Sequence, residues 1–226
     1  MCDVRQELEI VYADERLLVV HKPAGLLTVG GPDDPASLET RLAEQGLSAS
    51  AVHRLDRDVS GCVLCAKDRE MWESLADMFR ERALKKIYWA LALGVVGPAE
   101  GQWKYPLLEE HGMARVSAKG RPSQTRYRTL NRFARASELE IELVTGRYNQ
   151  IRVHAAHGGH ALVGERKYAR GKEDFLRAPR VALHAWRLEF THPISGESVN
   201  ACAELPPELA DLREQARANQ RVRKSP

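Results

Sequence analysis

Apolar runs and alternating apolar and polar positions recur along this chain, a pattern typical of strands in a packed sheet. Residues 8–20 hold a short alternating run, a polar turn and the apolar stretch Leu17–Val20, which predict two strands joined by a turn. Further strands are expected where such runs recur, over residues 62–66, 86–96, 123–130, 137–144, 181–190 and 198–203.

Apolar residues at spacings of three and four predict a helix over residues 68–84, capped by Asp68. Shorter helices are expected over residues 38–45, 149–157 and 209–220, and a loop over residues 97–101. Many strands, few helices and no strict strand–helix alternation predict an α+β fold. The stripe expected to pack in the core along the first helix comprises Met71, Trp72, Leu75, Met78 and Phe79.

The composition is that of a soluble globular protein, with 226 residues, 43% of them hydrophobic and 29% charged. No stretch is long and apolar enough to suggest a membrane span, and the first ten residues resemble no targeting signal. These features predict a cytoplasmic protein that acts away from membranes. With no linker-like segment, the chain is expected to form one catalytic domain over residues 1–212 and a basic tail over residues 213–226.

Charge is distributed unevenly behind the net charge of +3. Residues 112–172 carry 13 Lys and Arg against 4 Asp and Glu, and residues 213–226 carry 5 against 1. A cationic half on a weakly charged protein favours a polyanionic partner such as nucleic acid, although a solvated basic surface has the same composition.

The stretch His53–Gly61, HRLDRDVSG, packs charges directly before an apolar run. Asp56 lies between Arg54 and Arg57, and neighbouring cations favour an ionised carboxylate that can serve as a nucleophile. A structural ion pair in a turn fits the same residues, and spacing alone does not choose between Asp56 and Asp58.

A second candidate stretch is Thr145–His154, TGRYNQIRVH, which leaves a predicted strand and starts a short helix. A helix N-terminus with Arg147 and Arg152 suits an anion such as a phosphate or a carboxylate. Exposed surface charge is the alternative.

Two spacings resemble metal sites but are not expected to bind metal. Cys62 and Cys65 would point to opposite faces of a strand, so a buried structural role is favoured. Gly158 and Gly159 interrupt the helix before the last histidine of HxxHxxH, which separates His160 from His154 and His157.

Taken together, these stretches resemble the RluA family of pseudouridine synthases. The motifs occur in family order: HKPAG at residues 21–25, HRLDRDVSG at 53–61, KIY at 86–88, TGRYNQIRVH at 145–154, LHA at 183–185 and THP at 191–193. The chain differs from the family pattern at four positions, where His21 replaces asparagine, Val59 threonine, Asn149 histidine and Glu165 aspartate. The chain starts close to the catalytic region, so the S4-type RNA-binding domain of some relatives is not expected.

The resemblance implies an RNA pseudouridine synthase, an isomerase that moves the ribose of specific uridines in rRNA, in tRNA or in both from uracil N1 to C5. It implies the pseudouridine-synthase fold, a mixed, largely antiparallel sheet with flanking helices around an RNA-binding cleft. The target base is expected to flip out of its stack. No cofactor or metal is expected, the partner is RNA, and the protein is expected to be a monomer.

The resemblance also assigns the site. Asp56 is the implied nucleophile, attacking either the sugar carbon or the base, Arg152 its partner cation, and Tyr88 a residue that stacks on the uracil. Arg54 and Arg57 are the expected phosphate or loop contacts, and Asp58 has no role in the reaction. The remaining residues expected to bind substrate are His53, Arg147, Gln150 and Ile151.

Two other classes of protein fit these residues less well. An RNA-binding module with an inactive site is disfavoured because Asp56, Tyr88 and Arg152 are all present. A glycoside hydrolase using Asp56 with Asp58 or Glu165 is disfavoured because only 6% of the chain is aromatic.

Overall fold

The computed structural model describes residues 7–31, 36–169, 171 and 174–221. These residues divide into two compact units. The first unit comprises residues 1–86 and 185–204, and the second comprises residues 87–184 and 205–226. None of the helices described is both long and apolar enough to cross a membrane.

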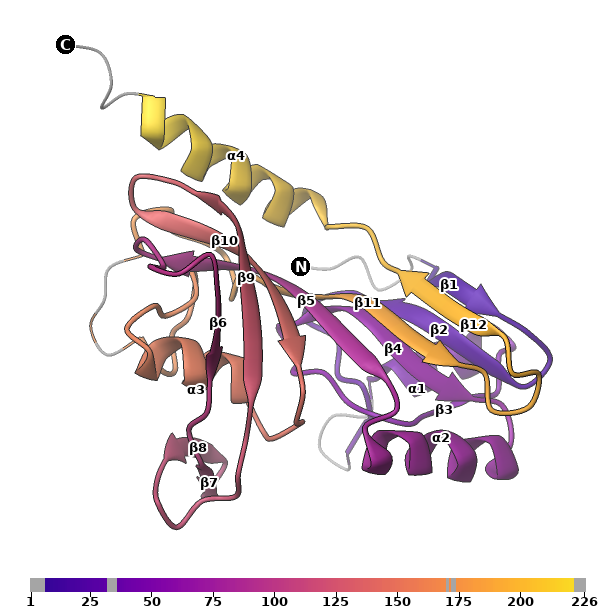
Figure 1. Cartoon of the computed structure of the whole chain (residues 1–226). Helices are drawn as coiled ribbons and strands as arrows, with labels where there is room; N and C mark the ends of the chain where they lie inside the picture. The colour runs from indigo at the N-terminus through magenta and orange to yellow at the C-terminus, as the bar shows by residue number, and fades with distance from the viewer. Residues whose placement is uncertain (1–6, 32–35, 170, 172–173, 222–226) are drawn as a thin grey trace. The chain divides into compact units, whose positions relative to one another are not determined.

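The first unit is built on a sheet in which β2 lies between β1 and β4, with antiparallel pairing on both sides. β4 also bonds to the short β3 and to β11, and β12 pairs antiparallel with β11 (Figure 1). The strands are β1 (Glu9–Ala13), β2 (Leu17–Lys22), β3 (Ser50–Ala51), β4 (Ser60–Ala66), β11 (Leu183–Thr191, mostly in this unit) and β12 (Ser198–Cys202).

Two helices belong to the first unit, α1 (Leu38–Glu44) and α2 (Arg69–Glu81). The side chain of Asp68 caps α2 by accepting from the Met71 amide, as predicted. Met71 and Leu75 are buried in the core. Trp72 was expected in the core but is 38% exposed, and its indole N–H donates to the Ala51 carbonyl.

Glycine at position 61 allows β4 to approach β11 closely. Gly61 has a φ of 121°, and a Cβ there would overlap the main chain of Ala185. Close packing against β11 therefore requires glycine at position 61, the last residue of the charged stretch.

The sheet of the second unit has the strand order β5-β10-β9-β6, with antiparallel pairing throughout. These strands are β5 (Lys85–Leu93, mostly in this unit), β6 (Glu100–Trp103), β9 (Thr125–Arg132) and β10 (Ala136–Leu143). A separate hairpin pairs β7 with β8, and two helices complete the unit. These elements are β7 (Leu107–Glu110), β8 (Met113–Val116), α3 (Gln150–His157) and α4 (Pro207–Arg221).

The two faces of this second sheet carry different elements. Tyr88 on β5 lies opposite Ile141, which lies opposite Tyr127, so these side chains share one face. α3 packs on that face, where Gln150 and His154 bond the Thr125 hydroxyl.

The opposite face carries a buried glutamate. Glu138 accepts from the Trp89 indole at 2.7 Å and from the Asn131 amide at 2.6 Å, and Arg213 of α4 lies 3.9 Å away. α4 therefore packs on the side of the sheet opposite α3. Its buried residues include Leu209, Leu212 and Ala216.

All the strands and helices predicted above are confirmed, within a few residues at their ends. The sequence analysis missed the two-residue strand β3, the strand β6, part of which was assigned to a loop, and the β7–β8 hairpin. α4 continues through Arg213, where the basic tail was expected to begin. Residues 222–226 of that tail lie outside the described part of the chain.

Candidate active site

Asp56 lies in the loop that joins β3 to β4 in the first unit. It is half-buried and begins a turn in which the Val59 amide donates to the Asp56 carbonyl at 3.1 Å. The turn brings the chain from the charged stretch directly into the buried strand β4.

The residue before Asp56 is anchored through its main chain. The hydroxyl of buried Thr28 accepts from the Leu55 amide at 3.0 Å and donates to the Leu55 carbonyl at 3.1 Å. One side chain thereby satisfies both polar main-chain groups of Leu55.

The residue after Asp56 is anchored in the same way. The Arg57 carbonyl accepts from the Gly25 amide at 2.8 Å and from Lys22 Nζ at 3.2 Å. Lys22 is fully buried, and its ammonium group also donates to the carbonyls of Pro23 and Leu26. Residues 22–28 therefore hold the main chain on both sides of Asp56.

His53 has a structural contact in this loop. Its Nε2 accepts from the Leu64 amide at 3.0 Å, and its ring packs against Phe79. Burial, with a contribution from the Lys86 charge, lowers the pKa of His53 to about 3, so the ring is neutral at physiological pH. Its expected role in substrate binding stays a prediction.

The charged neighbours of Asp56 lie at the surface. Arg54, Arg57 and Asp58 are exposed, in contrast to half-buried Asp56. Exposed arginines are accessible to phosphate groups, as the sequence analysis expected of Arg54 and Arg57.

Tyr88 is buried on β5 in the second unit, with 7% of its surface exposed. It lies on the sheet face that carries α3, the helix of Arg152. The structure therefore places two of the three predicted catalytic residues on the same side of one sheet.

The loop before α3 is closed by Gln150. Its amide oxygen accepts from the Thr145 hydroxyl and the Arg147 main-chain amide, and its amide nitrogen donates to Gln124 and Thr125. Gln150 is 2% exposed, so these four contacts give it a structural function, and its substrate contact stays a prediction.

Two further predicted residues belong to this segment. Arg147 is half-buried, and its buried Nε has no hydrogen-bond partner among the described residues, so its expected contact with a phosphate stays a prediction. Ile151 is buried, and its predicted place in a substrate pocket stays a prediction.

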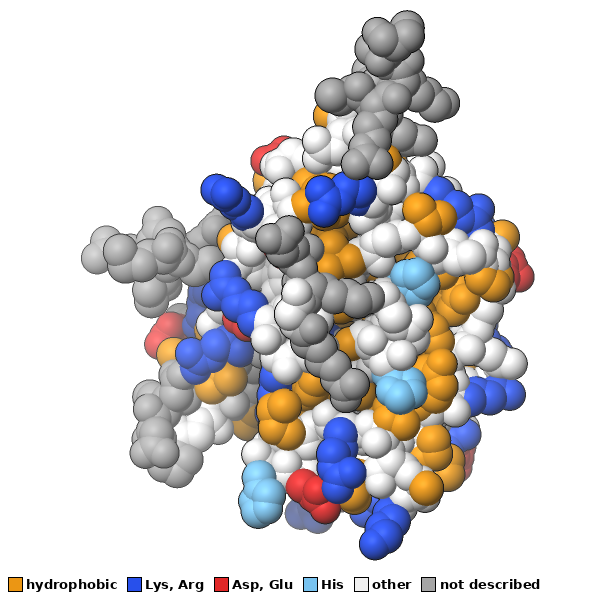
Figure 2. Space-filling view, turned by 90° about the vertical axis from the view of Figure 1, so that its left-hand side faces the viewer, with side chains coloured by type: hydrophobic (Ala, Val, Ile, Leu, Met, Phe, Trp, Pro, Cys, Tyr) orange, Lys and Arg blue, Asp and Glu red, His pale blue; other side chains and the backbone are white. Residues whose placement is uncertain are grey.

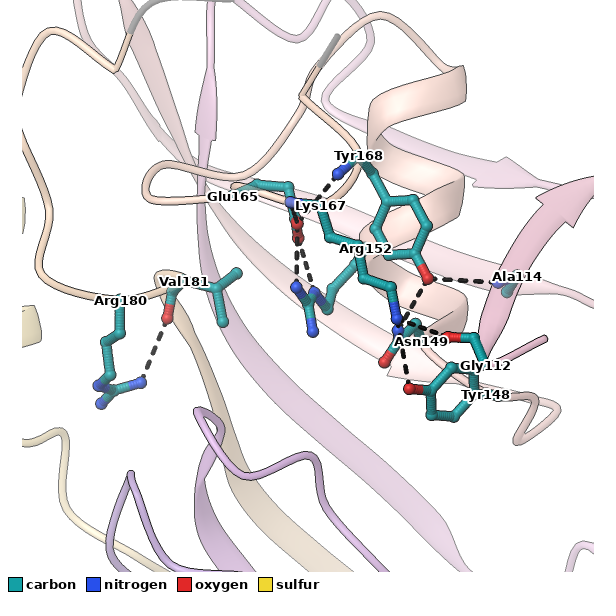
Figure 3. Close-up of polar contacts among 10 residues, drawn as sticks. All are labelled: Gly112, Ala114, Tyr148, Asn149, Arg152, Glu165, Lys167, Tyr168, Arg180 and Val181. Atoms are coloured by element: carbon teal, nitrogen blue, oxygen red, sulfur yellow. Dashed lines mark hydrogen bonds and ion pairs between the residues drawn. The ribbon is translucent and has the colours of Figure 1, made fainter. Parts of the chain in front are cut away.

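Arg152 projects from α3 to Glu165, which lies after the helix in the chain (Figure 3). Its Nε lies 2.6 Å from Glu165 Oε2, and its Nη2 lies 2.9 Å from Oε1. The Arg152 side chain is 12% exposed and that of Glu165 is 0% exposed. The sequence analysis named Asp56 as the partner of Arg152. The carboxylate described here is Glu165, and a pairing with Asp56 stays a prediction.

Tyr168 and Lys167 extend this network. The Tyr168 hydroxyl accepts from the Asn149 side-chain amide at 2.8 Å and from the Ala114 amide at 3.3 Å (Figure 3). Lys167 donates to the Gly112 carbonyl at 2.7 Å. The segment after α3 is thus tied to the β7–β8 hairpin.

The three histidines of HxxHxxH have separate partners. His154 bonds Thr125, Ser123 and the Tyr105 carbonyl, His157 packs on the Tyr105 ring, and His160 bonds the Leu93 carbonyl. Burial lowers the pKa of His154.

The two cysteines of the CxxC pattern are both buried on β4. Cys62 belongs to the core that contains Met71 and Leu75, and burial raises the pKa of each thiol to about 12. Such thiols are protonated and pack as small apolar groups.

The cationic segment is only partly neutralised. Figure 2 shows a face on which Lys and Arg side chains are scattered among hydrophobic ones, with few Asp and Glu. Exposed Arg121, Arg135 and Arg166 have no carboxylate partner among the described residues. Four other cations of residues 112–172 form ion pairs, namely Arg115–Glu110, Arg126–Glu142, Arg128–Glu140 and Arg152–Glu165.

The sequence analysis assigned no structural role to four side chains that shape these regions: Lys22, Thr28, Glu165 and Tyr168. Lys22 had a local signal, because it is a charge directly after an apolar run. Glu165 was noted only as a departure from the family pattern and as the second acid of the disfavoured hydrolase. Thr28 and Tyr168 had no local signal, since their partners lie far along the chain.

A family model, related sequences and solved structures all match this chain to RNA pseudouridine synthases. A family model described as RNA pseudouridylate synthase matches residues 16–157. Ribosomal large subunit pseudouridine synthase C of Vibrio cholerae is 37% identical over 214 residues, which cover 90% of this chain and 68% of that protein. Ribosomal large subunit pseudouridine synthase D of Nitrosomonas europaea is 36% identical over 222 residues, which cover 91% of this chain and 64% of that protein.

Two solved human structures share the fold. RNA Pseudouridylate Synthase Domain Containing 1 is 26% identical with a TM-score of 0.76, covering 97% of this chain and 96% of that chain. RNA Pseudouridylate Synthase Domain Containing 4 is 24% identical with a TM-score of 0.77, covering 92% of both chains. The fold class predicted from the sequence is therefore confirmed.

Proposed function

Because this chain belongs to the RNA pseudouridylate synthase family, it is an RNA pseudouridine synthase, and we propose that it isomerises uridine in large-subunit ribosomal RNA with Asp56 as nucleophile. The reaction breaks the bond between C1′ of the ribose and N1 of uracil and forms a bond from C1′ to C5. C5 loses its proton and N1 gains one, so substrate and product are isomers.

The observation that supports Asp56 best is its anchoring. Thr28 bonds both main-chain groups of Leu55, and Lys22 and Gly25 bond the Arg57 carbonyl. Such anchoring limits the movement of a reactive group and keeps it oriented for attack, which lowers the entropic cost of reaching the transition state.

Arg152 and Tyr88 are the proposed partners in the reaction. Arg152 is a half-buried donor that stabilises negative charge developing during the exchange of bonds. Tyr88, on the same side of the second-unit sheet, stacks on the flipped uracil and assists proton transfer.

The proposed RNA follows from the relatives, two of which are named for the ribosomal large subunit. Arg121 and Arg147, which have no carboxylate partner among the described residues, are proposed to hold phosphates around the flipped nucleotide. Action as a monomer in the cytoplasm, without cofactor, stays a prediction.

The test compares Asp56→Asn with its matched control Asp58→Asn, on transcribed large-subunit rRNA and on tRNA. An amide does not serve as this nucleophile, so Asp56→Asn should lower pseudouridine formation more than about a thousandfold while the protein stays folded. Asp58→Asn should retain most activity. Reversed results would show that the nucleophile is misassigned, and activity on tRNA alone would refute the proposed substrate.

A further inference from the structure

We propose that Glu165 is a positioning residue, which with Asn149 and Tyr168 orients Arg152 so that only the end of its guanidinium group faces the reacting nucleotide. The inference rests on the proposed function, because it assumes that Arg152 acts in the isomerisation. It adds to that function a residue that touches neither substrate nor reacting atoms.

The first step concerns which edge of the guanidinium group is occupied. An arginine offers two edges to a carboxylate or other planar acceptor, the side edge with Nε and Nη2 and the end edge with Nη1 and Nη2. Glu165 takes the side edge of Arg152 with both of its oxygens. The end of the guanidinium group that carries Nη1 therefore points away from Glu165.

The second step concerns Glu165 itself, which is held as firmly as the residue it orients. Its side chain is fully buried, and Oε1 also accepts from the main-chain amides of Lys167 at 2.7 Å and Tyr168 at 3.2 Å. The preceding Gly164 has a φ of 76°, and a Cβ there would overlap the Arg180 carbonyl. The carboxylate therefore has little freedom to move. Its fixed position determines the orientation of the Arg152 guanidinium group.

The third step concerns the face of the guanidinium group. The Arg152 guanidinium carbon lies 5.6 Å from the centre of the Tyr168 ring, within the range of a cation–π contact. Asn149 holds the hydroxyl of that ring. Because Asn149 and Arg152 are three residues apart at the start of α3, both lie on the side of the helix that contacts residues 165–168.

The fourth step concerns charge. Glu165 neutralises the charge of Arg152 inside the second unit. Arg152 is therefore expected to act through the direction of its hydrogen-bond donors and less through net positive charge. In a poorly hydrated site the direction of such a donor determines how well it stabilises developing charge. A small rotation of the guanidinium group should therefore affect the chemical step more than RNA binding.

Two of the four departures from the family motifs lie in this network. Glu165, in place of aspartate, is one methylene longer, and Asn149, in place of histidine, makes the contact to Tyr168. The geometry around Arg152 is thus adapted to a glutamate in this chain, and an aspartate should reach the guanidinium group less well.

The test measures the single-turnover rate at saturating rRNA, the affinity for that RNA and stability in urea, at a temperature where every variant is folded. Glu165→Gln should lower the rate about 10- to 100-fold with RNA affinity within about twofold of the wild type. Glu165→Asp, which keeps the charge, should be less impaired than Glu165→Gln. The matched control is Glu138→Gln, which alters a buried carboxylate on the face of the second-unit sheet opposite α3. It should lose about as much stability as Glu165→Gln but keep a near-wild-type rate.

Several outcomes would overturn the inference: a wild-type rate for Glu165→Gln, an equal fall in rate for Glu138→Gln, or a fall in RNA affinity with no change in rate. If Glu165→Gln does not fold, Glu165→Asp carries the test, and its wild-type rate would overturn the inference. A wild-type protein that forms no pseudouridine in any RNA would refute the proposed function itself, which is a separate result.

Discussion

Asp56 and Arg152, the two charged residues proposed to act on the same nucleotide, are held by opposite means. The loop of Asp56 is anchored through main-chain atoms of its neighbours, with Thr28 and Lys22 as the anchors. Arg152 lies on a regular helix, and its side chain is anchored by the side chain of Glu165.

The difference follows from where each residue lies. A loop has no regular hydrogen bonds of its own, so its main chain needs outside partners. A helix satisfies its main chain internally, but a long arginine side chain still has several rotatable bonds, so the side chain needs the partner. Substitutions of the anchors should therefore have different consequences in the two regions.

The largest effect is expected from removing Arg152. Arg152→Ala leaves the fully buried Glu165 without its cation, which should cost about 3–5 kcal/mol in the free energy of unfolding, and should lower the single-turnover rate more than about 100-fold. Arg152→Lys should be milder but impaired, because lysine has no planar fork. Urea denaturation and single-turnover assays measure the two quantities.

The double variant Arg152→Ala with Glu165→Ala separates stability from catalysis. It removes the unpaired carboxylate and should recover much of the stability but none of the rate. A double variant that regains the wild-type rate would show that Arg152 serves only to neutralise Glu165.

The next effect is expected from the anchor of the Asp56 loop. Lys22→Met keeps a long side chain but leaves the carbonyls of Pro23, Leu26 and Arg57 without this donor, which should cost about 2 kcal/mol or more in unfolding free energy. The single-turnover rate should fall about tenfold because the loop becomes more mobile. The control is Lys67→Met, since Lys67 donates to one carbonyl, that of Asp14. Equal losses in both variants would contradict the specific anchoring of the loop.

A smaller effect is expected from pH. The pKa of His53 is about 3 in the folded protein and 6.5 ordinarily, so the unfolded chain binds the proton more readily. The stability that depends on the neutral ring is fully present above about pH 6.5 and is lost as pH falls toward 3. Between pH 7.5 and 5 this should amount to about 1–2 kcal/mol in urea denaturation. His53→Gln, whose amide oxygen can accept from Leu64, should show a smaller dependence, and an unchanged dependence would contradict this assignment.

The smallest effect is expected from the end of the chain. Deleting residues 222–226 removes Arg223 and Lys224 but leaves α4 intact. If both cations contact RNA, the slope of log affinity against log salt should fall by roughly 1.4–1.8. The saturated rate should stay unchanged, because neither Asp56 nor Arg152 is affected. An unchanged slope would identify a solvated tail, and a large fall in rate would show a role in catalysis.

Most of the fold was predictable because its signals are local. The cap Asp68, the strand alternation around Tyr88 and the glycine stop after His157 depend on residues a few positions apart. The β7–β8 hairpin was missed although His111 and Gly112, both with positive φ, form the two-residue turn that suits such a hairpin. β6 was missed because four residues with one glycine carry too weak an alternation.

The sequence by itself determined the family, most of the strands and helices and the residues proposed to react, because motif spacing and periodicity are properties of neighbouring positions. Only the tertiary structure determined that Arg152 meets Glu165, that Lys22 lies buried under the loop of Asp56, and that Trp72 is exposed. The physical reason is that a hydrogen bond or ion pair between distant residues depends on the geometry of the folded chain. Many carboxylates along a sequence are chemically equivalent partners for an arginine, and packing selects one of them.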